Sequence, residues 1–403
     1  MKLKQIFTFI SFMILLMACN QSNKSNGYLS TEEVSTEGIN LSTTELFSQN
    51  KAAVLSLADR YMKQVPVPIT NFSCSRSAGG IHDFYSEGDY WWPNPDDPEG
   101  AYIRKDGQSN PDNFVAHRQA MRNLNVWIST LVAAYKLTRD EKYAMHAIKH
   151  LDAFFLNKNT LMNPSLLYAQ AIKGKVTGRG IGIIDTIHLI EVAKSIEILA
   201  KLKSLKGEKL AGLKSWFYKY ADWLNTHPYG LAEKDHGNNH STWWAAQVAA
   251  FAHLIGREDL MDVARQQFKK LLSEQMASDG SFPEELSRTK PYSYTLFNLE
   301  GYAVLCQIAS EDKENLWNYT GNNGSLKKAW KFMIPFMKDK SKWIKPPDVK
   351  HFDELPIQSP GLLFAGTAYG DQEFLRTWKS LNPDRESEEI KRTYPILQPI
   401  LWL

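Results

Sequence analysis

The chain has 403 residues, of which 43% are hydrophobic and 12% aromatic, and this composition indicates one well-packed globular body. The formal net charge is +3, and it would be +1 without Lys2 and Lys4. A globally basic surface is therefore excluded. We expect no nucleic-acid partner, and binding of a polyanion would need a local cluster of cations.

The N-terminus has the pattern of a secreted, lipid-anchored protein. Lys2 and Lys4 precede an apolar run over residues 6–17, and Ala18 comes directly before Cys19. The run is too short to span a bilayer, and a cysteine in this place is what lipoprotein processing requires. We interpret residues 1–18 as a signal peptide and Cys19 as the lipid anchor. An ordinary signal peptide followed by a chance cysteine is the alternative.

In this interpretation residues 19–28 are a polar tether and residues 29–403 form a single domain. The protein would be periplasmic or exposed at the cell surface, and it would meet the outer membrane only through the lipid on Cys19. Cys74 and Cys306 could pair or remain as buried thiols. We expect a monomer.

Hydrophobic spacing predicts helices in nearly all parts of the chain. Residues 124–135, 189–200 and 244–255 each place apolar side chains on one helical face. Further helices are predicted over residues 141–156, 209–225, 258–275, 295–308, 325–337 and 371–380. Strand-like alternation is rare, and we find no repeat of fixed period. Consecutive helices joined by short connections indicate an all-α fold, a toroid or bundle whose loops build a cleft at one end.

The first polar motif is Asn238-Asn239-His240, just ahead of a predicted helix that Ser241 or Thr242 could cap. Amide side chains and free backbone N–H groups at a helix N-terminus favour an anion, so a substrate carboxylate could bind here. An ordinary Asn-rich turn is the alternative.

The same stretch offers a weaker pattern for a metal. His236 and His240 have a spacing that could hold zinc on a helix, with Asp235 nearby. Gly237 and the asparagines predict a loop between the two histidines instead. We therefore expect no metal.

The second motif is the charged stretch over residues 284–294, which contains Arg288, Lys290, Tyr292 and Tyr294. The planar guanidinium of Arg288 could neutralise a carboxylate, and a tyrosine could present its phenol to the same group. A solvated loop is the alternative.

The third motif is the aromatic-rich segment over residues 82–107, which runs without helical spacing. Aromatic rings among polar side chains suit the faces and hydroxyl groups of sugars, although some of the rings could simply be buried packing.

These motifs together resemble a known superfamily. Asn239-His240, then Trp243, then Arg288 and Tyr294 are similar to the Asn-His, Arg and Tyr set of the alginate lyase superfamily, which includes polysaccharide lyase family five. Residues 82–107 and 162–182 also resemble its domain pattern, and the resemblance runs from about residue 75 to about residue 310. The N-terminal half, the Arg-to-Tyr loop and the tail from Glu311 depart from family five and indicate a sister family, such as family thirty-eight, among lipoproteins of Bacteroidetes type.

The resemblance implies an incomplete (α/α) toroid and metal-independent β-elimination on an anionic uronic-acid polymer, without a cofactor. It makes Asn239, His240, Arg288 and Tyr294 the catalytic residues. Mannuronate-containing alginate is the expected substrate, with glucuronan as another. The residues expected to bind the polymer are His82, Tyr85, Trp91, Trp92, Arg104, Tyr168, Gln170, Arg179, Trp243 and Tyr292.

The chemistry gives each of the four residues a role. The C5 hydrogen of a uronate becomes acidic only when its carboxylate is neutralised, which Asn239, Arg288 and His240 would do. Tyr294 would take the proton and return it to the departing O4, if Arg288 or His240 lowers the pKa of its phenol. In guluronate the two groups lie on opposite faces, so His240 would be the base and Tyr294 the acid.

Two other classes remain open. A glycan-binding lipoprotein would explain Cys19 and the aromatic residues, but it gives no reason for the four catalytic candidates. A toroidal glycoside hydrolase would need two carboxyl groups that flank a bond, and Asp83, Glu87, Asp185 and Glu285 are available without forming a recognisable pair.

Overall fold

The computed structural model of the chain describes residues 43–403, with side chains from residue 50 onward. The predicted signal peptide, Cys19 and the tether lie outside the described residues. Within the described part, no helix is long and apolar enough to cross a membrane.

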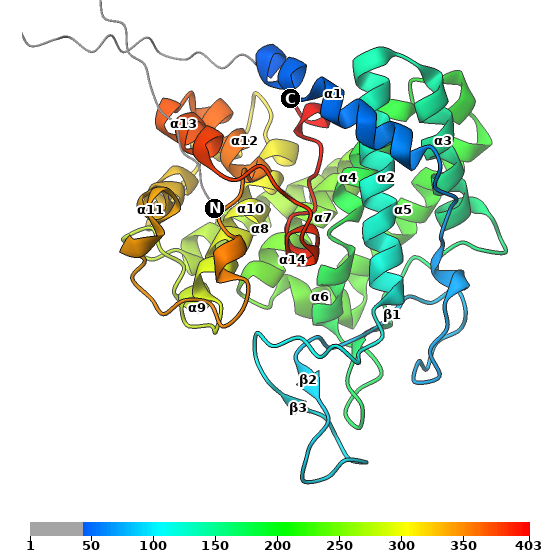
Figure 1. Ribbon diagram of the computed structural model, residues 1–403, viewed down its shortest axis with the longest axis horizontal. Coiled ribbons are helices and arrows are strands. Elements are labelled where there is room, and N and C mark those ends of the chain that lie inside the picture. Colours follow the sequence, from blue (N-terminus) through cyan, green and yellow to red (C-terminus); the bar gives the residue numbers. More distant parts are fainter. Residues whose placement is uncertain (1–42) are drawn as a thin grey trace, which may run out of the picture. The chain divides into compact units, whose positions relative to one another are not determined.

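Most of residues 43–403 are helical, and six short strands lie in the connections (Figure 1). The α-helices are α1 Thr43–Tyr61, α2 Ala116–Thr138, α3 Glu141–Leu151, α4 Leu189–Leu199, α5 Glu208–Thr226, α6 Pro228–Lys234, α7 Asn239–Ile255, α8 Glu258–Gln275, α9 Pro283–Leu286, α10 Pro291–Ala309, α11 Leu326–Lys338, α12 Pro360–Tyr369, α13 Gln372–Ser380 and α14 Glu388–Thr393. The strands are β1 Tyr85–Glu87, β2 Trp91–Trp92, β3 Ile103–Arg104, β4 Tyr168–Ala171, β5 Thr320–Gly321 and β6 Gly324–Ser325.

The predicted helices are confirmed. Apolar side chains at helical spacing are buried on one face of most of them, and α7 and α10 are buried nearly all round. Helix α8 has the predicted bounds, α5 and α11 differ from prediction by one residue at each end, and α13 differs by one residue at its start. Helix α3 continues into the π-helical turn η2 Asp152–Leu156, which completes the stretch predicted over residues 141–156.

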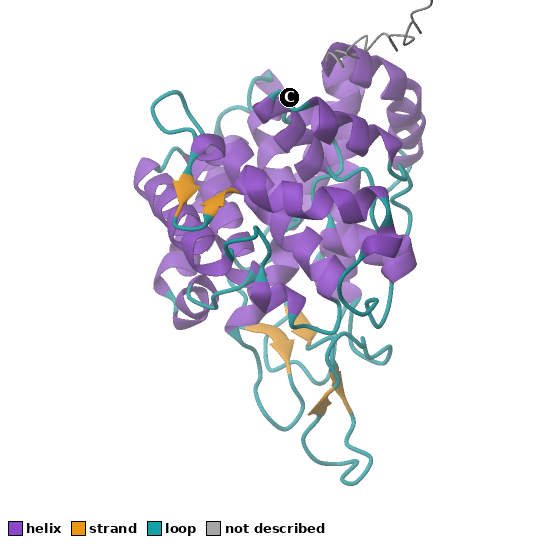
Figure 2. Cartoon of the chain, turned by 90° about the vertical axis from the view of Figure 1, so that its left-hand side faces the viewer, coloured by secondary structure: helices purple, strands orange, loops and turns teal. Residues whose placement is uncertain are grey.

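The helices pack in two layers, as Figures 1 and 2 show. Helix α4 contacts α2 and α7, α7 contacts α10, and α10 contacts α12, which makes an inner row. Helices α3, α5, α8 and α13 pack behind this row, against α2, α7, α7 and α12 respectively. This arrangement of helix pairs around one core is the expected (α/α) toroid.

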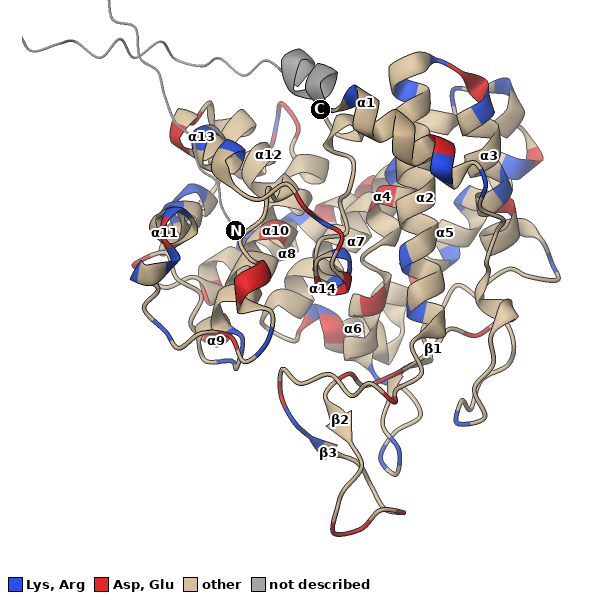
Figure 3. Cartoon of the chain, viewed as in Figure 1, with Lys and Arg blue, Asp and Glu red and all other residues tan. Residues whose placement is uncertain are grey.

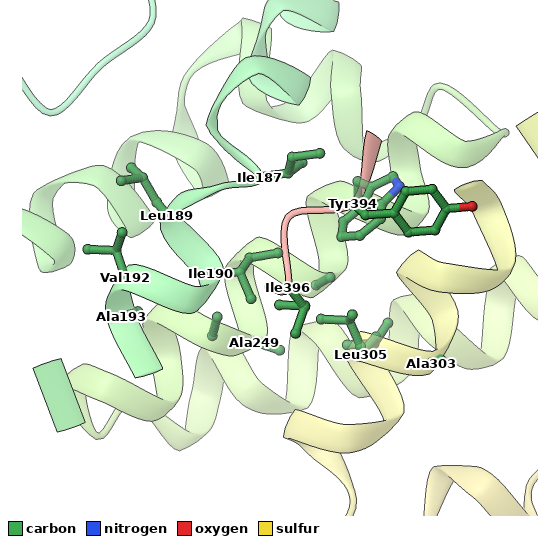
Figure 4. Packing of buried hydrophobic residues seen from close by; sticks show 14 of the residues in the cluster. Ile187, Leu189, Ile190, Val192, Ala193, Ala249, Ala303, Leu305, Tyr394 and Ile396 are labelled. Carbon is green, nitrogen blue, oxygen red and sulfur yellow. The ribbon is translucent and has the colours of Figure 1, made fainter. Parts of the chain in front are cut away.

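The C-terminal tail fills the middle of the inner row. Tyr394 and Ile396 are buried among side chains of α4, α7 and α10 (Figure 4). The carboxylate of Glu191 on α4 accepts hydrogen bonds from the backbone N–H groups of Leu397 and Gln398, at 2.8 and 2.9 Å. Helix α14, just before this tail, is thereby fixed next to the inner helices.

Pairing between the short strands holds together loops from distant parts of the chain. Strand β1 pairs with β4 in parallel, and β2 pairs with β3 in an antiparallel hairpin. Figures 1 and 2 show these strands together at one end of the helices, on the side of α6 and α9. The predicted placement of a loop-built cleft at one end is consistent with this arrangement.

Two further expectations concern the cysteines and the charge. Cys74 is half-buried and Cys306 is buried, and both are free thiols, so the two do not pair.

Lys and Arg are interspersed with Asp and Glu along the helices (Figure 3). A binding site for a polyanion must therefore be a local feature.

Candidate active site

One cavity of about 450 Å³ opens at the end where the strands lie, and it brings the polar motifs together. Asn239 and His240 at the start of α7 lie on its wall with Arg288, which precedes α10, and Tyr294 in the first turn of α10. The other lining residues are Asp89, Tyr90, Trp91, Arg104, Arg118, Arg122, Gln170, Arg179, Ile181, Ile184, Asp185, Ile187, His188, His236, Asn238, Lys290, Ser293, Phe297, Glu389, Arg392 and Thr393.

The turn before α7 is shaped by its own asparagine. Asn238 is the N-cap, and its side chain accepts a hydrogen bond from the backbone N–H of His240 at 3.1 Å. The prediction that Ser241 or Thr242 caps the helix is wrong, because the helix already begins at Asn239. The Ser241 hydroxyl instead donates to the Glu233 carbonyl and accepts from Gly237 N–H. This turn holds Asn239 and His240 at the cavity.

A buried carboxyl group lies directly behind Asn239. The Glu285 side chain accepts hydrogen bonds from Asn239 Nδ2, at 2.8 and 2.9 Å, and from the Asn239 backbone N–H at 2.7 Å. Burial raises the pKa of Glu285 although Asn239 and Arg288 work against this shift. The Asn239 amide therefore has at most one N–H left for a ligand.

His240 is oriented by a second buried carboxyl group. Its Nδ1 lies 2.7 Å from Glu233 Oε1, and Glu233 on α6 has a fully buried side chain. A hydrogen bond at Nδ1 fixes the ring and leaves Nε2 as the nitrogen available in the cavity. Such a ring can either donate to an anion or accept a proton.

The histidine pair does not form a metal site in the described residues. The rings of His236 and His240 lie 4.8 Å apart, and a loop separates the two residues as predicted. Asp235 instead pairs with Lys270. Within residues 43–403, no three His, Cys, Asp or Glu side chains are grouped so that they could hold a metal ion.

Arg288 is held by an aspartate from the β3 loop. Its guanidinium contacts Asp106 at 3.0 and 3.3 Å, and Arg104 contacts the same carboxylate at 2.6 Å. Burial works in the other direction, but Arg288, Thr289 and Arg104 together hold the pKa of Asp106 at about 2. Asp106 therefore stays charged and keeps Arg288 in place.

Tyr294 makes two contacts that decide its chemistry. Its hydroxyl lies 2.8 Å from the hydroxyl of Tyr90, and the Arg288 guanidinium lies 4.3 Å from the centre of its ring. The sequence-based expectation that a cation lowers the pKa of this phenol is corrected. Burial and the neighbouring Tyr90 raise the Tyr294 pKa well above 10, and Arg288 offsets only part of that shift.

Four of the predicted polymer-binding residues lie on the cavity wall. Trp91 and Arg104 face each other across the β2–β3 hairpin. The Arg179 guanidinium lies 5.8 Å from the Trp91 ring and donates to the side chain and carbonyl of Gln170, at 3.0 Å each. Gln170 has a positive φ of 50°, which is rare for a residue with a side chain and is held here by these contacts.

Four other predicted residues from the same segments do not line the cavity, because their polar atoms serve local structure. His82 Nδ1 bonds to the Leu161 carbonyl at 2.6 Å, and the buried Tyr85 donates to Glu87. Trp92 Nε1 donates to the Gln108 carbonyl, and the Tyr168 ring packs against the backbone of Gly79. His82, Tyr85, Trp92 and Tyr168 thus lie outside the wall of this cavity, and their contact with the polymer stays a prediction.

Trp243 and Tyr292 are core residues. The Trp243 side chain is fully buried on the inner side of α7, and its Nε1 donates to the Phe297 carbonyl at 3.2 Å. Tyr292 packs its ring edge-on against Trp343 and Phe352, and its hydroxyl donates to the Phe336 carbonyl. Both side chains are out of reach of a ligand in the cavity, so their expected contact with substrate is corrected.

The sequence analysis did not predict three contacts that hold the four candidate residues in place. These contacts come from Tyr90, Glu233 and Glu285. Tyr90 stands inside the aromatic segment, two residues after Gly88, but nothing in the sequence pairs it with Tyr294. Glu285 lies three residues before Arg288, which was a usable signal. Glu233 lies seven residues before His240, and the turn between them hides the contact.

The chain is similar to known proteins over most of its described length. The family described as alginate lyase matches residues 70–343. An alginate lyase of Cobetia marina is 30% identical over 128 residues, which are 32% of this chain and 33% of that protein, so the match spans about a third of the relative. The crystal structure of an alginate lyase from Bacteroides ovatus is 30% identical, with a TM-score of 0.75, and the match covers 87% of this chain and 97% of that one. Alginate lyase A1-III from Sphingomonas species A1 shares the fold, at 15% identity and a TM-score of 0.50, over 79% of this chain and 88% of that one.

Proposed function

The chain belongs to the alginate lyase family of polysaccharide lyases, and from this membership and the site geometry we propose that it cleaves uronic-acid polymers by β-elimination. Mannuronate-containing alginate is the proposed substrate, with glucuronan as the second candidate. A product profile on polymannuronate, polyguluronate, mixed alginate and glucuronan tests this choice. Fastest release of unsaturated products from polymannuronate is expected, and fastest release from glucuronan or polyguluronate would reassign the substrate.

The observation that carries the proposal is the position of Arg288 over Tyr294. A guanidinium 4.3 Å from the phenol ring places a carboxylate-binding cation beside a group able to transfer a proton. Asn239 and His240 lie on the wall of the same cavity. A uronate carboxylate at Arg288 would have its neighbouring C5 close to the Tyr294 hydroxyl.

In the proposed mechanism, neutralisation comes first and proton transfer second. Arg288, helped by His240 and the Asn239 amide, offsets the negative charge that grows on the carboxylate when the C5 proton leaves. Tyr294 takes that proton and returns it to the departing O4, which lies on the same face in mannuronate and glucuronate. For guluronate, His240 Nε2 would act as base from the opposite face, with Tyr294 as acid.

The raised pKa of Tyr294 gives the proposal a pH signature. The phenolate is the basic form, so its fraction is small at neutral pH and grows as the pH rises toward the pKa. We expect kcat/KM on polymannuronate to increase steadily from about pH 7 to about pH 9, by up to tenfold per pH unit. Initial rates across this range test the expectation. A rate that is flat or falls over the range would contradict Tyr294 as the base.

A hydrolase needs a cavity carboxyl group that can donate a proton, and the cavity carboxylates are poorly suited to this. Asp89 pairs with Arg118 and Arg392, and Glu389 pairs with Lys290 and Arg392. Burial opposes the shift, but these cations lower the pKa of Asp89 and hold that of Glu389 at about 2. Asp185 accepts hydrogen bonds from Ser86 and Arg118. Asp89 and Glu389 therefore stay ionised, and the oxygens of all three carboxylates are engaged by neighbouring donors, which favours a lyase over a hydrolase.

The other carboxyl groups weighed for a hydrolase lie outside the cavity wall. Asp83 accepts from Gly80 N–H and Asn163, and Glu87 is bound by Arg76. Glu285 lies behind Asn239. A binding protein without catalysis would have no use for a phenol, a guanidinium and an oriented imidazole around one cavity.

We also propose that the reaction needs no added metal. The neutralising charge that a divalent cation would supply is provided here by Arg288, with Asn239 and His240 beside it. A purified domain that starts near Leu29 should keep its rate on polymannuronate after thorough chelation. Loss of activity that one specific cation restores would contradict this and return His236 and Asp235 as ligand candidates.

The anchoring of the protein remains a proposal from the sequence. If Cys19 carries a lipid, Cys19→Ala should abolish incorporation of a labelled fatty acid and move the protein from the membrane fraction to the soluble fraction. An unchanged distribution between the fractions would indicate an ordinary signal peptide with a chance cysteine.

A further inference from the structure

The inner end of the cavity holds a second group of polar and cationic side chains, which come from helices and not from the Arg288 loop. Arg122 comes from α2, His188 from the residue before α4, and Arg392 with Thr393 from α14. The C-terminal tail that packs among the inner helices fixes α14 in this position. The side chains at this end of the cavity are therefore held in place by packed helices.

Among the arginines at this end of the cavity, Arg122 makes the fewest hydrogen bonds. Its one hydrogen bond among the described residues runs from Nη2 to Gln119 Oε1, at 3.1 Å, and its buried Nε has no partner there. Arg118 and Arg392, by contrast, are bound to Asp89, Asp185 and Glu389. A buried guanidinium nitrogen without a partner costs free energy, so its presence calls for an explanation.

The charge of the cavity wall is not balanced. Seven cationic side chains line it against three carboxylates, namely Arg104, Arg118, Arg122, Arg179, Arg288, Lys290 and Arg392 against Asp89, Asp185 and Glu389. The carboxyl groups of Asp106, Glu233 and Glu285 lie behind the wall, and Glu388 lies near Arg122. Burial, with Arg118 and Arg392, lowers the pKa of Arg122, and burial, with Arg122 and Arg392, lowers that of His188 to about 3. At the inner end, Arg118 and Arg392 are paired with carboxylates, whereas Arg122 forms no ion pair among the described residues, although Asp89 and Glu388 lie near it.

We propose that Arg122, His188 and Arg392 form a second anion subsite, which binds the carboxylate of a uronate unit next to the unit that reacts. The proposal rests on the proposed function, because a polyuronate carries one carboxylate on each sugar. A guanidinium with free N–H groups matches a carboxylate, and neutral His188 adds a hydrogen-bond donor. The subsite makes the enzyme select for a charged neighbour as well as for a charged reacting unit.

The proposal predicts opposite effects on binding and on stability. Arg122→Met removes a cation that is repelled by its neighbours, so the thermal midpoint of the full chain should stay the same or rise. The same change should raise KM for polymannuronate about tenfold or more, with kcat much less affected. Arg122→Lys keeps the charge but lacks the planar pair of N–H donors, so its KM should lie between those of wild type and Arg122→Met.

Arg376→Met is the matched control, because Arg376 is an exposed arginine on α13 that does not line the cavity. It should leave KM unchanged. An unchanged KM in Arg122→Met would overturn the subsite. A raised KM accompanied by a fall in the thermal midpoint would also overturn it, because Arg122 would then support the fold.

Binding without turnover separates this proposal from the proposed function. A mannuronate tetrasaccharide is titrated calorimetrically into Tyr294→Phe and into Tyr294→Phe with Arg122→Met. Weaker binding in the double variant supports the subsite, even if wild type releases no unsaturated product and the lyase assignment fails. Equal binding in both proteins, with normal cleavage by wild type, overturns the subsite alone.

Discussion

Tyr294→Phe is expected to lose nearly all turnover, by a factor of about 10² to 10⁴, while the affinity for polymannuronate changes little. The variant keeps the aromatic ring and so keeps the contact with Arg288 at 4.3 Å. It removes the hydroxyl that lies 2.8 Å from Tyr90 and that is assigned both proton transfers. A group that acts mainly in the transition state should affect kcat and not ground-state binding. Steady-state rates and calorimetric titration with a tetrasaccharide measure the two effects.

Two other tyrosines serve as controls for this prediction. Tyr292 is a buried core residue whose hydroxyl donates to the Phe336 carbonyl, so Tyr292→Phe should keep turnover. Tyr90→Phe removes the partner of the Tyr294 hydroxyl without removing the base. If Tyr294→Phe retained near-native turnover and Tyr90→Phe did not, the proton transfers would belong to Tyr90.

Arg288→Ala should weaken both substrate binding and turnover, because the guanidinium touches the carboxylate before and during proton removal. Loss of a charge-assisted contact of this kind predicts about a tenfold or larger rise in KM, together with a larger loss in kcat/KM. Kinetics on polymannuronate at fixed ionic strength measure both. Full activity in Arg288→Ala would exclude this residue from the carboxylate site.

Arg104→Ala is the matched control, because Arg104 binds the same Asp106 carboxylate but is not the arginine over Tyr294. Its kcat should fall much less than that of Arg288→Ala. Equal losses in the two variants would point to the position of the Asp106 loop, and not to carboxylate neutralisation, as the cause.

Asn239 illustrates a case in which the structure refines a role taken from the sequence. Its amide donates to the buried Glu285 carboxyl group, so one N–H at most reaches a ligand. Because of this limited donor capacity, we expect Asn239→Ala to weaken substrate binding less than Arg288→Ala does and to reduce mainly turnover. Burial raises the pKa of Glu285, although the hydrogen bonds from Asn239 and the charge of Arg288 act against this shift.

The helices could be predicted from sequence because their signal is local. Burial of one face imposes a spacing of three and four residues on apolar side chains, and the stretch over residues 258–275 is an example with both ends found. Asn239, His240, Arg288 and Tyr294 could be found because they stand in polar stretches that interrupt this spacing. Their convergence in one cavity was inferred from the resemblance, and the geometry now places them together.

The remaining parts of the site depend on contacts between distant segments, which carry no local signal. Tyr90 meets Tyr294 only because the β2–β3 hairpin folds over the start of α10. Arg392 reaches the cavity only because Glu191 and its neighbours hold the tail among the inner helices. The aromatic residues that contact substrate were the hardest to predict. A tryptophan such as Trp243 looks the same in the sequence whether it packs in the core or contacts a sugar.

The most direct test of the account is to count product ends during cleavage of polymannuronate. Elimination creates one ultraviolet-absorbing unsaturated sugar for each new reducing end. We expect the two counts to rise together in wild type and both to be nearly absent in Tyr294→Phe. Reducing ends that accumulate without ultraviolet absorbance would show hydrolysis and would contradict β-elimination at this site.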